Sequence, residues 1–153
     1  MNQQLPRIYR SLAQALKHQL DQIATFIGYQ LTFVDMHTEL LGSLYHLQVH
    51  ANPIDPLLSA LDRELGRVCG LLPEEYRNYC VKHLLHAVLQ GYKYVILNGG
   101  NSRCFSISDA DRLANDLNSI KGIFWADGQG IPNLAIQVVY NKQVFKCTPS
   151  PKV

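Results

Sequence analysis

The sequence has 153 residues, of which 47% are hydrophobic and 17% are charged. This length fits one domain with one hydrophobic core, and this hydrophobic content excludes a disordered chain. Fourteen Lys and Arg residues against twelve Asp and Glu residues leave a net charge of +2, too small a surplus for nucleic-acid binding by bulk charge. No apolar run reaches the ~18 residues that cross a bilayer, and the N-terminal residues lack the apolar core of a secretory signal, so we expect a cytoplasmic chain.

The first half of the chain predicts two amphipathic helices. From Pro6 to about Gly28, hydrophobic residues recur every three or four positions and form one stripe, which is made of Ile8, Leu12, Leu16, Leu20, Ile23 and Ile27. A second run follows Gly28 and extends to about Leu47. This second run is apolar over a wide arc, so we expect it to be the most buried helix.

The middle of the chain predicts a break and two further helices. The prolines of residues 51–56 interrupt the helical pattern, and Asp55 looks like the N-cap of a third helix that stops at Pro73. A long fourth helix would follow, with acidic residues in its first turn. We expect it to end in a left-handed turn at Asn98-Gly99-Gly100.

The last third of the sequence predicts one more helix and then a change of structure. The segment Ser108-Asp109-Ala110-Asp111 resembles a capping box that opens a fifth helix, and residues 127–130 would end it. Beyond Pro132, residues 135–145 are rich in β-branched and aromatic side chains that alternate with polar ones, so we expect a strand there. The predicted fold class is therefore an all-α antiparallel bundle of about five helices with an irregular or strand-like tail.

Histidines on two helices are the first candidates for a metal site. His46 and His50 are four residues apart, and Cys80, His83 and His86 step by three along the fourth helix. Each set could place two ligands on one helix face, but neither contains the glutamate of an HExxH motif. We favour ordinary helix histidines and predict no bound metal and no cofactor.

The loop from Asn98 to Arg103 contains two glycines, a hydroxyl group and a guanidinium group just before a helix, as an anion-binding loop would. It lacks GK[ST] and GxGxxG, so we favour a tight turn in which Arg103 caps a helix end. Trp125 fits either an interface anchor or core packing, and we favour the core.

Several sequence blocks, in a fixed order, resemble the plant unc-13-like (MUN-domain) family. They are IGYQLTFVD at residues 27–35, the pair Leu44-Tyr45, LSALDREL at residues 58–65, VILNGGNSRCF at residues 95–105 and DGQGIP at residues 127–132. The combination of GG-x-S-R-x-F with DGxGIP at this spacing is the most specific feature. The residues that carry these two motifs, with a structural or interaction role, are Gly99, Gly100, Ser102, Arg103, Phe105, Asp109, Gly128, Gly130 and Pro132.

The resemblance implies the C-terminal part of a MUN-type module, the MHD2 region, which belongs to a rod of stacked helical bundles. Such proteins act in exocytosis by priming or tethering vesicles, and plant members help to deliver proteins to the plasma membrane. The resemblance therefore implies a non-enzymatic interaction module of vesicle trafficking. Its implied partners are exocytic or tethering proteins, including full-length family members, with peripheral association at plasma or endosomal membranes and no nucleic acid.

The chain also departs from the family pattern. Family members are much longer, and the helix that normally follows the second motif is replaced here by the strand-like, basic tail. We therefore divide the chain into a helical segment, residues 1–132, and a divergent tail, residues 133–153, and expect an open apolar face on the fourth and fifth helices. Two alternatives remain: an anion- or metal-binding helical enzyme that uses the Gly99-Gly100-Arg103 loop or the histidines, and a truncated product without independent function.

Overall fold

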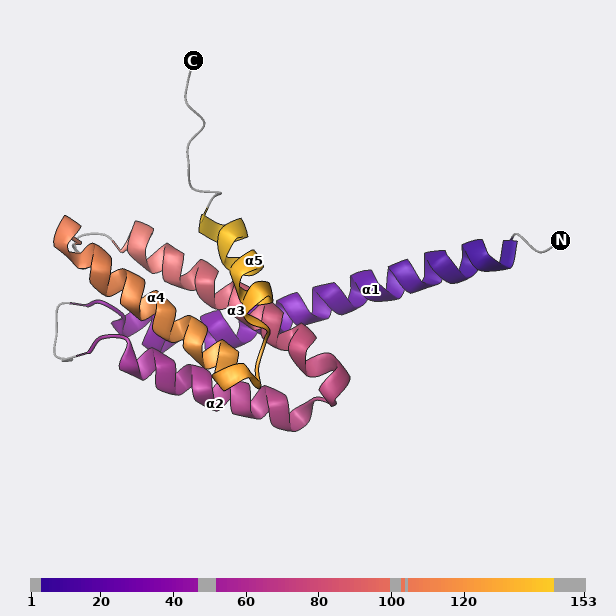
Figure 1. The fold of residues 1–153 in the computed structure, drawn as a ribbon, viewed down its shortest axis with the longest axis horizontal. Coiled ribbons are helices and arrows are strands. Elements are labelled where there is room, and N and C mark those ends of the chain that lie inside the picture. Colours follow the sequence, from indigo (N-terminus) through magenta and orange to yellow (C-terminus); the bar gives the residue numbers. More distant parts are fainter. Residues whose placement is uncertain (1–3, 47–51, 100–102, 104, 145–153) are drawn as a thin grey trace, which may run out of the picture.

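The computed structural model describes residues 4–46, 52–99, 103 and 105–144, and all regular elements in these ranges are helical. The α-helices are α1 (Gln4–Gln30), α2 (Asp55–Leu71), α3 (Glu74–Asn98), α4 (Ala110–Trp125) and α5 (Asn133–Val144). The predicted all-α fold class is confirmed. Figure 1 shows α2, α3 and α4 stacked together, while the N-terminal half of α1 projects beyond them as an arm.

The first predicted helix, from Pro6 to about Gly28, corresponds to α1, which ends at Gln30 and runs into two π-helical segments, Leu31–Asp35 and Thr38–Ser43. Gly28 itself lies inside α1, where this helix approaches α3 closely. A Cβ atom on Gly28 would lie 2.8 Å from the carbonyl oxygen of His83. Gly28 therefore allows two backbones to meet instead of interrupting a helix.

The core lies where the π-helical segments, α2 and α3 meet. Met36, Leu40 and Leu44 are fully buried, which confirms that the second hydrophobic run is a core element. It is not the most buried one, however, because α3 contributes more buried positions, including Leu84, Leu85 and Val88. The longer helix lies between α1, α2 and α5, so more of its surface is covered.

The boundaries around α2 and α3 mostly follow the predictions. α2 ends just before the Leu72-Pro73 pair, and α3 begins at Glu74. Asp55 is the first residue of α2 rather than its N-cap, and it accepts a hydrogen bond from Asn52 Nδ2 at 2.7 Å. The left-handed exit predicted for α3 is wrong at Gly99, whose φ of −65° is right-handed, and Gly100 lies outside the described residues.

α4 begins with a capping box, two residues earlier than predicted. The backbone N–H of Ser106 donates to Asp109 Oδ2 at 2.8 Å, and the Ser106 hydroxyl donates to the same oxygen. A 3-10 turn, Ile107–Asp109, then leads into α4. The box therefore pairs Ser106 with Asp109 rather than residues 108 and 111, because the 3-10 turn separates the cap from the α-helix.

The strand predicted after Pro132 is wrong, because residues 133–144 form α5. Ile136 and Val139 are buried at helical spacing, and the Nζ atom of Lys121 lies 3.6 Å from the centre of the Tyr140 ring. α5 packs on α3 and α4, so a helix does follow the second motif, and it covers the face that was expected to be open. Residues 145–153, the rest of the predicted tail, lie outside the described residues.

Candidate functional site

Arg103 of the first motif closes the end of a π-helical segment. Its Nε atom donates to the carbonyl oxygen of Leu44 at 2.7 Å, and Nη2 donates to that of Leu41. These carbonyls end the segment Thr38–Ser43, where a positive charge is favourable. Partial burial lowers the pKa of the guanidinium, yet arginine stays charged at neutral pH. Two of the five N–H donors of this guanidinium are thus engaged with the backbone.

The glycine of the same motif leaves room for this arginine. A Cβ atom on Gly99 would lie 2.6 Å from the Cβ atom of Arg103, so a larger residue would displace the arginine side chain. Gly100 and Ser102 lie outside the described residues. Gly99 and Arg103 therefore work together as one structural unit that joins the end of α3 to the π-helical segment.

Phe105 leads to a buried polar cluster that the sequence did not indicate. Its ring meets the ring of Tyr45 edge-on, with centroids 5.3 Å apart. The Tyr45 hydroxyl donates to Asp116 Oδ2 at 2.6 Å. The Tyr92 hydroxyl lies 2.8 Å from the Tyr45 hydroxyl and donates to the carbonyl oxygen of Leu113 at 3.0 Å. This cluster ties the turn at Tyr45 to α3 and α4.

Burial governs the electrostatics of this cluster. It raises the pKa of Tyr92 to about 12, and burial together with the hydrogen bond to Asp116 raises the pKa of Tyr45 well above its usual value. Tyr45 also has a positive φ of 59°, which is unusual for an aromatic residue. One signal in the sequence could have revealed the cluster: Asp116 lies within the apolar stripe of α4, where only a hydrogen-bonded acid is tolerated.

The second motif, Asp127 to Pro132, is the turn between α4 and α5. Gly128 has a φ of 89°, and the N–H groups of Gly130 and Ile131 donate to the carbonyl oxygens of Trp125 and Phe124 at 3.0 Å and 2.9 Å. A side chain on Gly130 would collide with Phe124, so glycine is required there. Pro132 accepts the first hydrogen bonds of α5. The described motif residues, with Asp109 in its capping box, thus shape the turns and helix ends around α3, α4 and α5.

Among the candidate metal ligands, His83 has structural partners on α1. His83 Nδ1 lies 3.1 Å from the hydroxyl of Thr25, and Nε2 lies 3.4 Å from Asp21, which also accepts a hydrogen bond from Tyr79. These contacts join α1 to α3. Within the ranges that the structure describes, no three His, Cys, Asp or Glu side chains gather as metal ligands would, and His50 is outside them.

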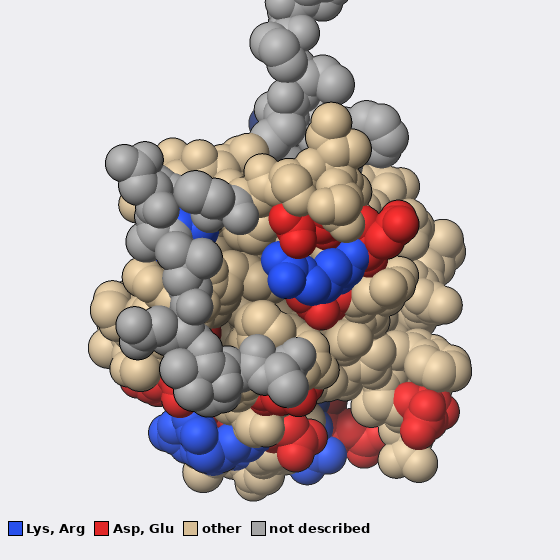
Figure 2. Space-filling view, turned by 90° about the vertical axis from the view of Figure 1, so that its left-hand side faces the viewer, with Lys and Arg blue, Asp and Glu red and all other residues tan. Residues whose placement is uncertain are grey.

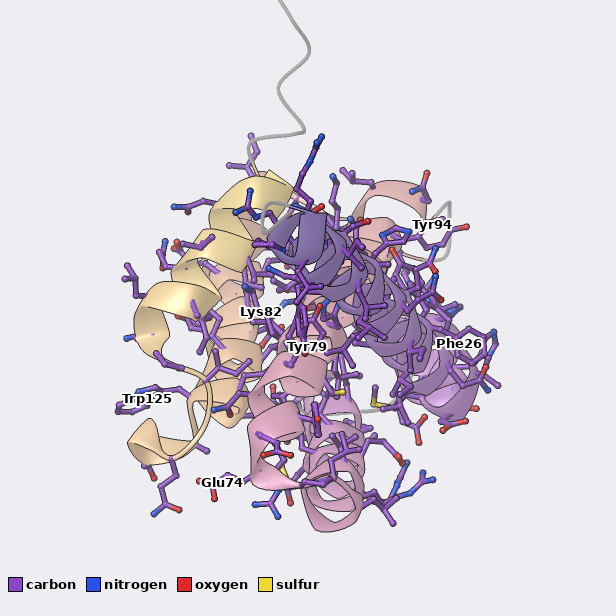
Figure 3. The ribbon with its side chains drawn as sticks, turned by 90° about the vertical axis from the view of Figure 1, so that its right-hand side faces the viewer. Phe26, Glu74, Tyr79, Lys82, Tyr94 and Trp125 are labelled. Carbon is purple, nitrogen blue, oxygen red and sulfur yellow. The ribbon has the colours of Figure 1, made fainter. Side chains whose placement is uncertain are left out.

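Uncovered hydrophobic side chains concentrate on α1. The large exposed ones on this helix are Leu5, Ile8, Tyr9, Leu12, Leu16, Ile23, Phe26 and Tyr29. Figure 3 shows Phe26 on the side of α1 that faces away from α4 and α5. The open apolar face thus lies on the first helix instead of the fourth and fifth.

Trp125 is 42% exposed, so the core position favoured for it is wrong.

Among the described residues outside α1, the large exposed hydrophobic side chains are spread over several elements. On the face in Figure 2, basic and acidic side chains lie next to one another among uncharged ones, without a broad field of one sign. A pocket of about 250 Å³ lies between α2, α3 and the end of α4 and is lined in part by Cys69, Arg77 and Gln129. Among the described residues, no helix is long and apolar enough to span a membrane.

Comparisons with known proteins place the chain in a family. The family model described as "PATROL1-like, TPR repeats" matches residues 3–146. A protein of Arabidopsis thaliana named "Protein unc-13 homolog" is 35% identical over 118 residues, which are 77% of this chain and 11% of that protein. The chain thus spans about a tenth of the length of this relative, whose name agrees with the unc-13-like resemblance. No solved structure matches. The chain belongs to the PATROL1-like family of TPR-repeat proteins.

Proposed function

We propose that this chain is a non-enzymatic interaction module of the vesicle-trafficking machinery that acts in exocytosis by binding other proteins. The observation that carries the proposal is the uncovered hydrophobic side of α1. A monomeric soluble protein rarely leaves a continuous apolar stripe of this length exposed, and such stripes mark interaction surfaces. The exocytic setting is supported by the family and by the unc-13 homolog at 35% identity.

The roles of the motif residues support an interaction module over an enzyme. The guanidinium of Arg103 is engaged by two backbone carbonyls, and Gly128 and Gly130 shape a turn. His83 is held between Thr25 and Asp21. Arg103, Gly99 and His83 thus have structural tasks, and the uncovered hydrophobic side of α1 is the surface that supports a binding function.

The partners that fit are proteins with amphipathic helices. Helical-repeat proteins bury the apolar face of one helical unit against the next, so the exposed side of α1 matches the surfaces that such proteins present. We therefore place tethering or priming proteins, including longer family members, among the partners. Peripheral attachment to plasma or endosomal membranes would then come through these proteins, with the chain on the cytoplasmic side.

The test is affinity purification of the tagged chain from detergent extracts of Arabidopsis membranes, with the bound proteins identified by mass spectrometry. Wild-type bait should recover tethering or SNARE components, and the bait Leu12→Glu/Leu16→Glu should lose them. The control bait is Gln14→Glu/His18→Glu, which adds the same two carboxylates, also four residues apart, to the opposite side of α1. It should behave as wild type. Recovery of no trafficking component by wild-type bait would count against the proposal.

A further inference from the structure

The exposed side of α1 has the repeat of a coiled-coil seam. Leu5, Tyr9, Leu12, Leu16, Gln19, Ile23 and Phe26 are separated alternately by four and three residues, which is the spacing of the two core positions of a heptad. All seven are exposed, and the apolar ones are between 56% and 73% exposed. We call these residues the α1 seam. It covers three heptads, the usual minimum for a coiled coil.

The positions beside the α1 seam carry no charge. In a coiled coil these flanking positions face the partner helix and select it by charge. Here they are occupied by Pro6, Ile8, Ala13, Ala15, Leu20, Gln22 and Ile27. The basic residues Arg7, Arg10 and Lys17 lie on other positions, away from the seam. Two copies of α1 can therefore pair without bringing like charges together, and an acidic partner helix would find no basic flank to contact.

The rest of the protein does not block the α1 seam. α3 packs on a different side of α1, where Ala24 and Gly28 are buried, and this contact is confined to the C-terminal half of the helix. Figure 1 shows the other half extending free of the bundle. Ile27, the last flanking position, is partly buried against the core, but the seam residues themselves are exposed from Leu5 to Phe26. A second helix can therefore lie along the seam, which at 1.5 Å per residue is about 32 Å long.

The area of the α1 seam suits a self-paired helix. Six large apolar side chains, each burying roughly 100 Å², would remove about 1,200 Å² from water in a pair, at the lower end of the range for stable interfaces. Gln19 is the polar exception in the seam. A single polar residue at such a position fixes the register of the two helices at some cost in stability.

We propose that the α1 seam is a dimerisation surface, and that its occupant is the same seam of a second copy of this chain. The proposal rests on the proposed function only in taking this side of α1 as an interaction surface. Because the second copy covers the α1 seam, other trafficking proteins bind the dimer and not the seam of a single chain.

Sedimentation velocity and light scattering on the purified full chain test the proposal between about 1 and 100 µM, a range that covers dissociation constants of weak to moderate dimers. Wild type should approach twice the 17.3 kDa monomer mass. Leu12→Glu/Leu16→Glu should raise the dissociation constant at least about a hundredfold. Gln14→Glu/His18→Glu should leave it within about threefold, since neither residue lies in the seam. Both variants change exposed residues, and circular dichroism should show unchanged helix content.

A further variant tests the register residue. Gln19→Leu replaces the polar seam position and should tighten the dimer about tenfold or more. An unchanged dissociation constant would overturn the proposal, because Gln19 would then lie outside the interface.

Three other results would overturn the proposal. One is a monomer at all concentrations. Another is a dimer that both double variants weaken equally, which would place the interface elsewhere. The third is a monomer that binds vesicles of phosphatidylcholine and phosphatidylserine through the seam, which would make a lipid surface the occupant. A monomeric chain that still recovers trafficking proteins would leave the proposed function standing, so the two failures are distinguishable.

Discussion

Replacing Arg103 with alanine separates the structural role of the first motif from a ligand-binding role. The guanidinium donates to the carbonyl oxygens of Leu44 and Leu41, and it is partly buried. Arg103→Ala removes both donors and leaves these two acceptors at the end of the π-helical segment without the arginine. A hydrogen bond to a charged group contributes about 1.5–3 kcal/mol, and partial exposure places each bond in the lower part of that range.

The expected loss is therefore about 3 kcal/mol of unfolding free energy. For a chain of this size, 1 kcal/mol moves the melting temperature by roughly 2–4 °C, so Tm should fall by roughly 6–12 °C. Thermal melts followed by circular dichroism and urea melts followed by Trp125 fluorescence measure this loss independently. Arg103→Lys should lose less, because it keeps the charge, but a single ammonium group cannot reproduce the fork of the guanidinium.

The control is Arg10→Ala, which removes an exposed arginine from α1 and should change stability by less than about 0.5 kcal/mol. The reasoning would be refuted if Arg103→Ala melted like wild type. Calorimetry with inorganic phosphate tests the alternative. If wild type bound phosphate and Arg103→Ala did not, while both melted alike, the anion-binding enzyme would become the better interpretation.

Two further predictions follow from the packing. Gly28→Ala should lower the free energy of unfolding in urea melts by about 1–3 kcal/mol, because its Cβ atom would lie 2.8 Å from the His83 carbonyl oxygen. Gly66→Ala is the control: its Cβ atom would have nothing within 4 Å, so it should raise the free energy of unfolding by about 0.5–1 kcal/mol. Equal effects of the two substitutions would contradict the close approach of α1 to α3. Burial raises the pKa of Tyr92 to about 12 and that of Tyr45 further, so the folded state keeps protons that the unfolded state loses above about pH 10. Stability should therefore fall between about pH 10 and pH 12, by about 1.4 kcal/mol per pH unit for each tyrosine. The variant Tyr45→Phe/Tyr92→Phe should flatten this slope, and an unchanged slope would assign it to other groups.

Helices were predictable from the sequence wherever local chemistry decides the outcome. Pro73 cannot continue α2, and Glu74 favours the positive end of the next helix, so the boundary between α2 and α3 followed from single residues. Residues 133–144 show the limit of this reasoning. Ile136, Val138 and Tyr140 alternate like a strand, but Ile136, Val139 and Tyr140 share a helix face equally well. Packing on α3 and α4 selects the helix, and the sequence of the segment alone does not contain that contact.

The partners of the motif residues were beyond prediction for a related reason. Arg103 bonds to carbonyl oxygens 59 and 62 residues away, and Tyr45 bonds to an acid 71 residues away. A helix-end role for Arg103 followed from its residue type and position, but the particular helix end depends on how the chain folds back. The cluster of Tyr45, Tyr92 and Asp116 left a weaker signal, an acid in an apolar stripe, which is open to several interpretations.

The apolar stripe of α1 shows what periodicity can and cannot establish. A repeat of three and four residues indicates that one side of a helix is buried against something, and the natural assumption is the core of the same chain. In α1 the core takes a neighbouring side, through Ala24 and Gly28, because small residues let α3 approach most closely. Leu12 and Leu16 then remain exposed on a helix too long for the bundle to cover. Ile27 at the end of the stripe still packs against the core, whereas Leu12 and Leu16 have no contact of this kind within the described part of the chain. Their heptad spacing and uncharged flanks are the reasons for which we propose a second copy of this helix as the external contact.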